Sequence, residues 1–276
     1  MKFFIAFLIG ITAPLGAQKE TLKVVSSVPP LSYIVKEIGQ ERVSACTIVP
    51  RGTSPHSFEP TVKQTLQACE AKIWFRVGEP FEEWLENALK PCFQKPDFID
   101  VQKSVTLLPR GCKCDCEEIF DSHIWFSLKE LKKVAQVVCQ VLASHDPFGK
   151  EIYEQNLAKF LGHILKLEQK ILNEQWKETA FVTSHAAFGY LCRDYGLTQM
   201  TLETEGGELS PKQLTALITR AKERRVSHVF VQPQYNPKGA RKVAALLNAE
   251  VVVIDPYEEN MLKNIETIVG ALSERS

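Results

Sequence analysis

Four side chains of types that commonly bind metals stand just after apolar runs that are typical of buried strands. His185 and Asp255 directly follow such runs, and His56 and His123 lie in the loops that come after two others. In an open parallel sheet, ligands bind in the crevice beyond the carboxyl ends of the strands. We therefore expect these side chains, two from each half of the chain, at the functional edges of their sheets.

Three imidazoles and one carboxylate form a nitrogen-rich, borderline-soft set of donors. Such a set suits Zn²⁺ and also accepts Mn²⁺ or Fe²⁺. Because all four donors are protein groups, the predicted coordination is closed, which favours capture of a metal over catalysis on it. The other histidines are placed less well, at a helix end, within a long helical segment and at the amino end of a strand: His145, His163 and His228.

Short apolar runs, rich in β-branched residues, alternate along the chain with amphipathic helical segments. Several runs are continuously apolar, as expected for strands buried on both faces of a parallel sheet. Two helix starts are marked, by Ser210 before a proline and by Thr61 before the apolar pattern Val62, Leu66 and Cys69. The predicted strands are Leu22–Ser26, Val43–Val49, Lys72–Val77, Asp97–Val101, Ala180–Thr183, Leu197–Leu202, His228–Gln232 and Glu250–Ile254.

From about Pro147 to Trp176 the pattern is that of one long helix, with Asp146 as its predicted N-cap. At 1.5 Å per residue this helix would be about 40 Å long, far longer than a usual crossover helix. We predict an α/β fold in which two (β/α)4 lobes with parallel sheets are joined by one long rigid helix, with the metal site in the cleft between the lobes. The predicted segments are a signal peptide at 1–17, an N-terminal lobe at 18–146, the linking helix at 147–177 and a C-terminal lobe at 178–276.

The N-terminus has the features of an export signal. Lys2 supplies a positive charge, Phe3–Ile11 form a short apolar core, and Pro14–Ala17 end on a small residue that signal peptidase accepts. The apolar run is too short to span a bilayer. No cysteine follows Ala17, so no lipid anchor is expected there, and the mature protein is expected in an extracytoplasmic space.

The 276-residue chain carries no net charge, because 33 basic residues balance 33 acidic ones. Without a basic excess, it is not expected to bind nucleic acid or an anionic membrane surface. With 45% hydrophobic residues, it can build one large or two modest cores.

Eight cysteines are many for an exported chain of this length. Their even number permits disulfides, whose pairing the sequence does not give. Cys46 falls in an apolar strand and Cys139 and Cys192 in amphipathic helices, where a small buried hydrophobic residue is the simplest interpretation. The eight are Cys46, Cys69, Cys92, Cys112, Cys114, Cys116, Cys139 and Cys192.

Three alternating cysteines with acidic neighbours precede His123, at Cys112, Cys114 and Cys116. One interpretation is an accessory soft-metal site, because thiolates are strong zinc donors. The other is a structural disulfide between one of them and Cys92, since an oxidising compartment favours such bonds. The sequence leaves both open.

Four motifs resemble those of the ZnuA/TroA-like solute-binding proteins of zinc and manganese ABC importers. Pro55–Thr61 resembles the Pro-His-x-x-Glu-Pro motif of that family, and Asp121–Trp125 resembles its Asp-Pro-His-x-Trp motif. Ser184–Tyr190 is similar to the segment that bears the third histidine, and Ile254–Pro256 matches the late Asp-Pro. The resemblance extends over essentially the whole chain, and the four motifs together are highly specific.

The resemblance implies metal ligands at His56, His123, His185 and Asp255. It also implies a periplasmic, monomeric solute-binding protein, without enzymatic activity, that captures a divalent transition metal and delivers it to an ABC permease at the cytoplasmic membrane. Zinc is the favoured metal, with manganese or iron as alternatives.

An alternative function is a secreted zinc-dependent hydrolase, in which three histidines would hold the metal and Asp255 would act as a base. The sequence shows no Gly-x-Ser-x-Gly elbow, no His-Glu-x-x-His and no phosphate loop to support it. An exported adhesin or a purely structural domain would leave the four strand-end side chains without a role.

Two residues depart from the family pattern next to predicted ligands. Ser122 replaces the usual proline, and Ala186 replaces the aspartate or asparagine that often follows the third histidine. Both affect the surroundings of the metal rather than its ligands. Glu59 orients His56, serves as a spare ligand, or places a negative charge before the following helix, and the sequence does not decide among these roles.

Overall fold

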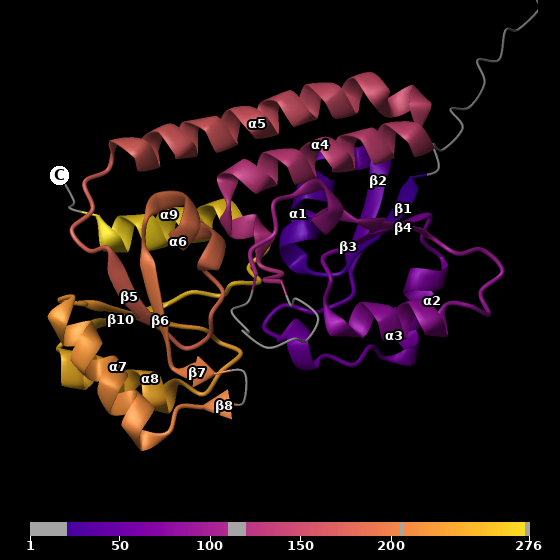
Figure 1. The fold of residues 1–276 in the computed structure, drawn as a ribbon. Coiled ribbons are helices and arrows are strands. Elements are labelled where there is room, and N and C mark those ends of the chain that lie inside the picture. Colours follow the sequence, from indigo (N-terminus) through magenta and orange to yellow (C-terminus); the bar gives the residue numbers. More distant parts are fainter. Residues whose placement is uncertain (1–20, 110–119, 205–206, 274–276) are drawn as a thin grey trace, which may run out of the picture.

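The fold consists of two four-stranded parallel sheets covered by helices (Figure 1). The computed structural model describes residues 21–109, 120–204 and 207–273, so the predicted signal peptide at 1–17 lies outside the described residues. The first sheet has the order β2-β1-β3-β4 and the second has the order β10-β9-β5-β6. The strands of these two sheets are β1 Leu22–Ser26, β2 Val43–Thr47, β3 Ile73–Arg76, β4 Asp97–Asp100, β5 Ala180–Thr183, β6 Thr198–Thr201, β9 His228–Val231 and β10 Glu250–Val253; β7 Glu203–Thr204 and β8 Gly207–Glu208 form a separate antiparallel pair.

All eight predicted strands are present, and the predicted α/β class is confirmed. Each pairing within the two sheets is parallel, for example with Val24 opposite Ile73. Several predicted strands were one or two residues too long, because the apolar run continues into the buried start of the next loop. Ile48 and Val49, for instance, are buried beyond the end of β2.

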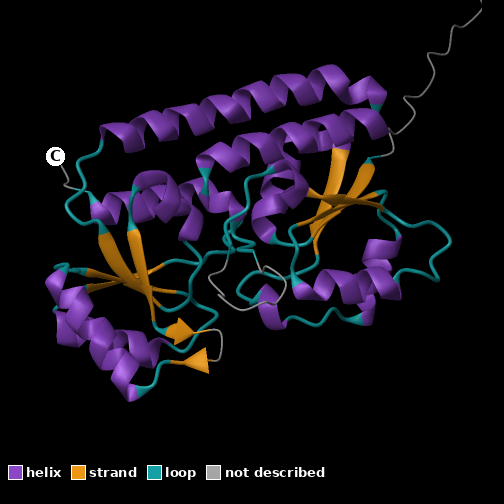
Figure 2. Ribbon diagram, in the orientation of Figure 1, coloured by secondary structure: helices purple, strands orange, loops and turns teal. Residues whose placement is uncertain are grey.

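Helices lie on both faces of the sheets (Figure 2). On β1, Val24 packs in the cluster that contains α1, whereas its neighbour Val25 packs in the cluster that contains α2 and α3. This burial on both faces explains why the strand is continuously apolar. The helices are α1 Pro29–Gly39, α2 Val62–Cys69, α3 Pro80–Ala88, α4 Leu128–His145, α5 Lys150–Asn173, α6 Gly189–Tyr195, α7 Pro211–Glu223, α8 Pro237–Leu247 and α9 Met261–Leu272.

The long helix is shorter than predicted and does not stand alone. Pro147–Gly149 form a 3-10 turn, and α5 ends at Asn173, so that Trp176 lies outside it. Its 24 residues span about 36 Å. Figure 1 shows α4 running along α5, and the two are joined by a salt bridge of 2.9 Å between Lys132 and Glu168. No described helix is both long and apolar enough to cross a bilayer.

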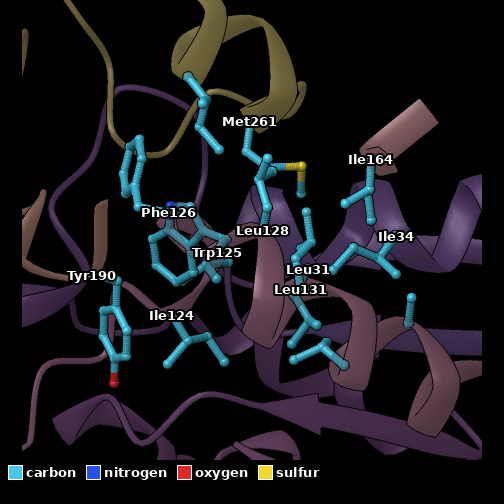
Figure 3. Packing of buried hydrophobic residues seen from close by; sticks show 14 of the residues in the cluster. Leu31, Ile34, Ile124, Trp125, Phe126, Leu128, Leu131, Ile164, Tyr190 and Met261 are labelled. Carbon is cyan, nitrogen blue, oxygen red and sulfur yellow. The ribbon is translucent and has the colours of Figure 1, made fainter. Parts of the chain in front are cut away.

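One hydrophobic core extends from the first sheet to the second. Its largest cluster includes Ile34 of α1, Ile164 of α5, Tyr190 of α6 and Met261 of α9. Figure 3 shows these side chains around the segment Ile124–Phe126, which lies between them. The two sheets are therefore held together by shared packing as well as by α5.

Two predicted helix starts are confirmed, and the third predicted N-cap residue, Asp146, begins the 3-10 turn Pro147–Gly149 rather than α5 itself. Thr61 and Ser210 each form a capping box, with Gln64 and Gln213 respectively. Asp146 makes no capping hydrogen bond through its side chain. Its carboxylate instead accepts hydrogen bonds from Arg42 and Tyr153.

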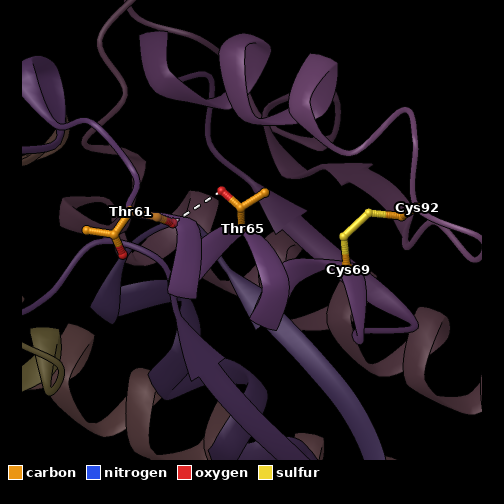
Figure 4. The surroundings of a disulfide bond; sticks show 4 residues. All are labelled: Thr61, Thr65, Cys69 and Cys92. Atoms are coloured by element: carbon orange, nitrogen blue, oxygen red, sulfur yellow. Dashed lines mark hydrogen bonds between the residues drawn. A yellow bond between two sulfur atoms is a disulfide. The ribbon is translucent and has the colours of Figure 1, made fainter.

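Helix α2 presents its apolar pattern outward rather than to the core. Val62 is 78% exposed and Leu66 is 59% exposed, whereas Ala68 is buried. The C-terminal residue of α2, Cys69, forms a disulfide with Cys92 after α3 (Figure 4). This covalent link holds α2 against the end of α3, so α2 does not depend on burying that apolar pattern.

Candidate metal centre

His56 lies beyond the carboxyl end of β2, in the 3-10 turn Pro55–Ser57. Its Nδ1 is 2.9 Å from Oε2 of Glu79, a carboxylate that is 3% exposed and immediately precedes α3. The other oxygen of Glu79 accepts a hydrogen bond of 2.6 Å from the Ser122 hydroxyl. Burial raises the pKa of Glu79, but the hydrogen bond and electrostatic contribution of His56, with Ser122, outweigh it and lower the pKa overall. Glu79 is therefore a buried, charged partner of the imidazole.

His123 is fully buried and directly precedes the 3-10 turn Ile124–Phe126. Its backbone N–H donates to Oδ1 of Asp121 at 2.9 Å, and its Nδ1 lies 2.7 Å from the same oxygen. Tyr190 of α6 donates a hydrogen bond of 2.9 Å to the Asp121 carbonyl. This local loop fixes the ring of His123 and ties it to a helix of the second half.

His185 follows β5 by two residues, and its backbone is held by Gln232 at the end of β9. The His185 N–H donates to Oε1 of Gln232 at 2.8 Å, and the Gln232 amide nitrogen donates back to the His185 carbonyl at 2.9 Å. The Nδ1 of His185 is 3.0 Å from Oε2 of Glu203, in the short strand β7 (Glu203–Thr204). The imidazole stacks on the ring of Tyr235, with centroids 5.0 Å apart.

The three imidazoles converge at the boundary between the two sheets. One ring nitrogen from each of His56, His123 and His185 lies within 4.8 Å of the other two. The Nε2 atoms of His56 and His185 are 3.2 Å apart, close to the roughly 3.3 Å expected between two nitrogens bound to one tetrahedral zinc. His56 and His185 also line a cleft of about 810 Å³, whose walls include Asp121 and Glu203.

The hydrogen bonds fix which nitrogen of each ring faces the centre. A neutral imidazole that donates its Nδ1 proton to a carboxylate keeps a lone pair on Nε2. Glu79, Asp121 and Glu203 each accept a hydrogen bond from the Nδ1 of one imidazole. Such carboxylate partners fix the ring orientation and raise the basicity of metal-binding histidines. The result is a group of lone pairs that a cation can satisfy together.

Asp255 follows β10 as predicted, but its carboxylate makes other contacts. Its Oδ1 accepts a hydrogen bond of 2.6 Å from the Gln234 side chain and one of 2.9 Å from the Tyr257 N–H. The hydroxyl of Tyr257, rather than this carboxylate, lies beside the imidazoles, 2.9 Å from Nε2 of His123. The role of Asp255 as a ligand therefore stays a prediction.

A sequence profile of the family described as "ZnuA: Zinc-uptake complex component A periplasmic" matches residues 24–274 of the chain. The match covers nearly all of the described sheets and all three histidines. The chain belongs to the ZnuA family.

Relatives of this ZnuA-family protein include two that align along most of its length. A "Putative metal-binding protein" of Chlamydia trachomatis serovar D is 26% identical, over 99% of both chains. The "High-affinity zinc uptake system protein ZnuA" of Bacillus subtilis is 26% identical, over 87% of this chain and 79% of its own length. Among solved structures, a "Crystal structure of ZnuA" is 30% identical with a TM-score of 0.83, covering 91% of this chain and 97% of that one.

Sequence reasoning missed two of the carboxylates and the tyrosine at the centre of this ZnuA-family chain. Glu79 comes three residues after β3, and Glu203 comes two residues after β6. Applying the strand-end rule to every acidic residue within three positions of a strand, and not to Asp255 alone, would have found both. Tyr257 lies two residues after Asp255, but no motif indicated a role for its hydroxyl.

Glu59 is not the partner of His56 in this structure. That role belongs to Glu79, which is buried, while Glu59 is exposed. Glu59 lies two residues before Thr61, the N-cap of α2, where a negative charge favours the helix dipole. The structure therefore gives the orienting role to Glu79, whereas the roles of Glu59 as a spare ligand and as a charge before α2 stay predictions.

The disulfide between Cys69 and Cys92 removes one interpretation of the cysteine loop. Cys92 is already paired, so it does not bond to Cys112, Cys114 or Cys116. Those three cysteines lie outside the described residues, and their role as an accessory metal site stays a prediction. As expected of small hydrophobic residues, Cys139 is buried and Cys46 and Cys192 are partly buried; burial raises the pKa of the Cys192 thiol to about 12.

Proposed function

We propose that this ZnuA-family chain is an extracytoplasmic solute-binding protein that captures a divalent transition metal and delivers it to an ABC permease. The observation that carries the proposal is the convergence of His56, His123 and His185, each with a carboxylate at Nδ1. Lone pairs that face one another repel unless a proton or a metal lies between them. A cation is therefore the natural ligand of this cluster.

The ligand set that we propose is His56, His123, His185 and Asp255. The imidazoles come from loops of both sheets, and Asp255 lies on the turn that carries Tyr257. For Asp255 to reach a bound metal, its carboxylate would exchange its contacts with Gln234 and the Tyr257 N–H for the metal. This requires a local change of one turn and no rearrangement of the sheets.

Zinc is the metal that we favour, with manganese or iron as alternatives. A site with three nitrogen donors favours zinc over manganese, whereas a site rich in oxygen donors suits manganese better. Relatives carry both kinds of name, such as the Bacillus subtilis zinc uptake protein and a "Manganese-binding lipoprotein MntA" of Halalkalibacterium halodurans. The proposed location is the periplasm, in line with the family description.

The hydrolase alternative gains no support from the geometry. A zinc hydrolase needs a carboxylate or other base that is available to a metal-bound water. Glu79, Asp121 and Glu203 are each engaged with an imidazole, and the ligand role proposed for Asp255 would occupy its carboxylate as well. The carboxylates around the imidazoles are therefore committed to orienting side chains.

The test is a zinc titration of chelator-stripped protein against a competing chelator of known affinity. We expect one high-affinity equivalent that His56→Ala and His185→Ala each remove. His163→Ala is the matched control, because His163 is exposed on α5 and touches none of the three imidazoles. Tight binding that survives both site substitutions would show that the assignment is wrong.

A further inference from the structure

The hydroxyl of Tyr257 lies among the nitrogen atoms that we assign to the metal, and the following inference rests on that proposed function. Tyr257 is fully buried. Its hydroxyl oxygen is 2.9 Å from Nε2 of His123 and 3.2 Å from Nε2 of His56. A phenol hydroxyl is both a hydrogen-bond donor and an acceptor, so the protonation of the two imidazoles determines whether it donates to them or accepts from them.

The protons around the centre can be counted. The Nδ1 atoms of His56 and His123 face Glu79 and Asp121, so neutral rings carry their protons there and lone pairs on Nε2. The hydroxyl of Tyr257 can donate its single proton to one of these two lone pairs at a time. The shorter distance assigns the donation to His123. The tyrosine thus satisfies part of the lone-pair cluster when no metal is bound.

A bound metal would use the same lone pairs. One lone pair cannot accept a hydrogen bond and coordinate a metal at once, so the donation from Tyr257 to His123 exists only in the metal-free protein. Meanwhile Asp255 is held away from the imidazoles by Gln234, whose own Oε1 is buried and has no hydrogen-bond partner among the described residues. The Gln234 amide is thus only partly hydrogen-bonded, so the arrangement that holds Asp255 is less stable than a fully hydrogen-bonded one would be.

We infer that Tyr257 is a placeholder at the metal position: its hydroxyl stabilises the metal-free centre, and metal entry displaces it in exchange for Asp255. An interaction made only in the free state lowers affinity by its own free energy, because a ligand responds only to differences between states. A single neutral hydrogen bond corresponds to about a two- to tenfold change in affinity. The residue therefore keeps binding weak enough for release.

The experiment compares zinc affinity in the wild-type chain, Tyr257→Phe and Tyr153→Phe. Tyr153→Phe also removes a buried hydroxyl, which here donates to Asp146 rather than to one of the three imidazoles of the centre. We expect Tyr257→Phe to bind zinc about two- to tenfold more tightly and to release it to a chelator more slowly by a similar factor. Tyr153→Phe should leave both quantities unchanged.

Thermal unfolding gives a second readout if Tyr257→Phe is less stable. The increase in melting temperature on adding zinc should be larger in Tyr257→Phe than in the wild type, because only its metal-free form has lost a hydrogen bond. The inference would be overturned if Tyr257→Phe had the same zinc affinity as the wild type and the same zinc-dependent increase in melting temperature. Weaker binding would overturn it too, since it would make the Tyr257 oxygen a ligand. Failure of the wild-type chain to bind zinc, manganese and iron alike would instead refute the proposed function.

Discussion

Replacing Glu79 by glutamine tests whether a buried carboxylate controls the strength of the metal centre. Glu79 is 3% exposed and bridges Nδ1 of His56 and the Ser122 hydroxyl. Glutamine has nearly the same shape and keeps an oxygen that can accept from His56, so the substitution removes mainly the negative charge. A metal on Nε2 withdraws electrons from the ring and makes the Nδ1–H a stronger donor. The carboxylate of Glu79 therefore stabilises the metal-bound state more than the metal-free state.

The magnitude follows from one contact of 2.9 Å. A hydrogen bond to a charged group contributes about 1.5–3 kcal/mol, and one between neutral groups about 0.5–1.5 kcal/mol. The difference of roughly 1–1.5 kcal/mol corresponds to about a tenfold loss of zinc affinity. Glu79→Ala also removes the acceptor, so its loss should approach a hundredfold, the upper end for such partners of a ligand.

The assay is chelator competition with zinc, and Glu59→Gln is the matched control. Glu59 is three residues from His56 in sequence and carries the same charge, but it is exposed and is not the partner of the imidazole. Glu59→Gln should change the affinity less than twofold. Equal losses in Glu59→Gln and Glu79→Gln would refute the reasoning, because they would show that the negative charge near the cleft matters and the hydrogen bond does not.

Three further predictions concern stability and metal selectivity. Hydrogen bonds from Arg42 and Tyr153 outweigh the effect of burial and lower the pKa of Asp146. Asp146→Asn should therefore lower the free energy of unfolding, measured in urea at pH 7, by about 2 kcal/mol. This difference from the wild type should disappear as the pH falls below about 4 and through the lowered pKa, because the wild-type carboxylate is then protonated. The Cys69–Cys92 disulfide spans 23 residues, so replacing both cysteines by serine should lower the unfolding free energy by about 3 kcal/mol while zinc affinity stays within twofold. His185→Glu should narrow the gap between zinc and manganese affinities in competition titrations, because it exchanges a nitrogen donor for an oxygen donor; an unchanged gap would mean that geometry sets the selectivity.

The fold was predictable where burial alone determines the pattern. The residues of β5 are buried on both faces, and the run Ala180–Thr183 was predicted with its observed ends. The end of α5 was not predictable in this way. Trp176 continues the helical pattern, but it pairs with Ser273 and packs against Tyr195, so its burial comes from parts of the chain distant in sequence.

The centre was predictable to the extent that its residues follow strands. His56, His123 and His185 were found because parallel strands bring their carboxyl ends to one edge. Their carboxylate partners are set by side-chain directions across loops, as when Glu79 reaches His56 from the start of α3. The orientation of Asp255 depends on Gln234, which follows a different strand, and a single strand's sequence carries no information about that pairing.

Opening the centre by separating the two sheets would expose their shared core. Tyr190, Met261 and Ile124 belong to one cluster that crosses the boundary. Exposing side chains of this size costs about 1.5–3 kcal/mol each. A wide opening would therefore cost far more than the free energy of a few surface contacts, and α5 would also have to bend.

Movement of the turn after β10 is a much cheaper route for metal exchange. That turn is attached to the first half of the chain by ion pairs from Lys36 to Glu259 and from Arg51 to Glu258. The two basic side chains are 49% and 61% exposed, and exposed pairs contribute at most about 1 kcal/mol each. A hydrogen bond of 2.9 Å from Trp125 to the Pro256 carbonyl adds a third attachment. The turn also carries Tyr257, which is fully buried and would give up its hydrogen bonds with His123 and His56 in the exchange. Because the two ion pairs are at the surface and the core shared by the sheets is not opened, we expect the turn, and with it Asp255, to move on metal exchange while the sheets stay in place.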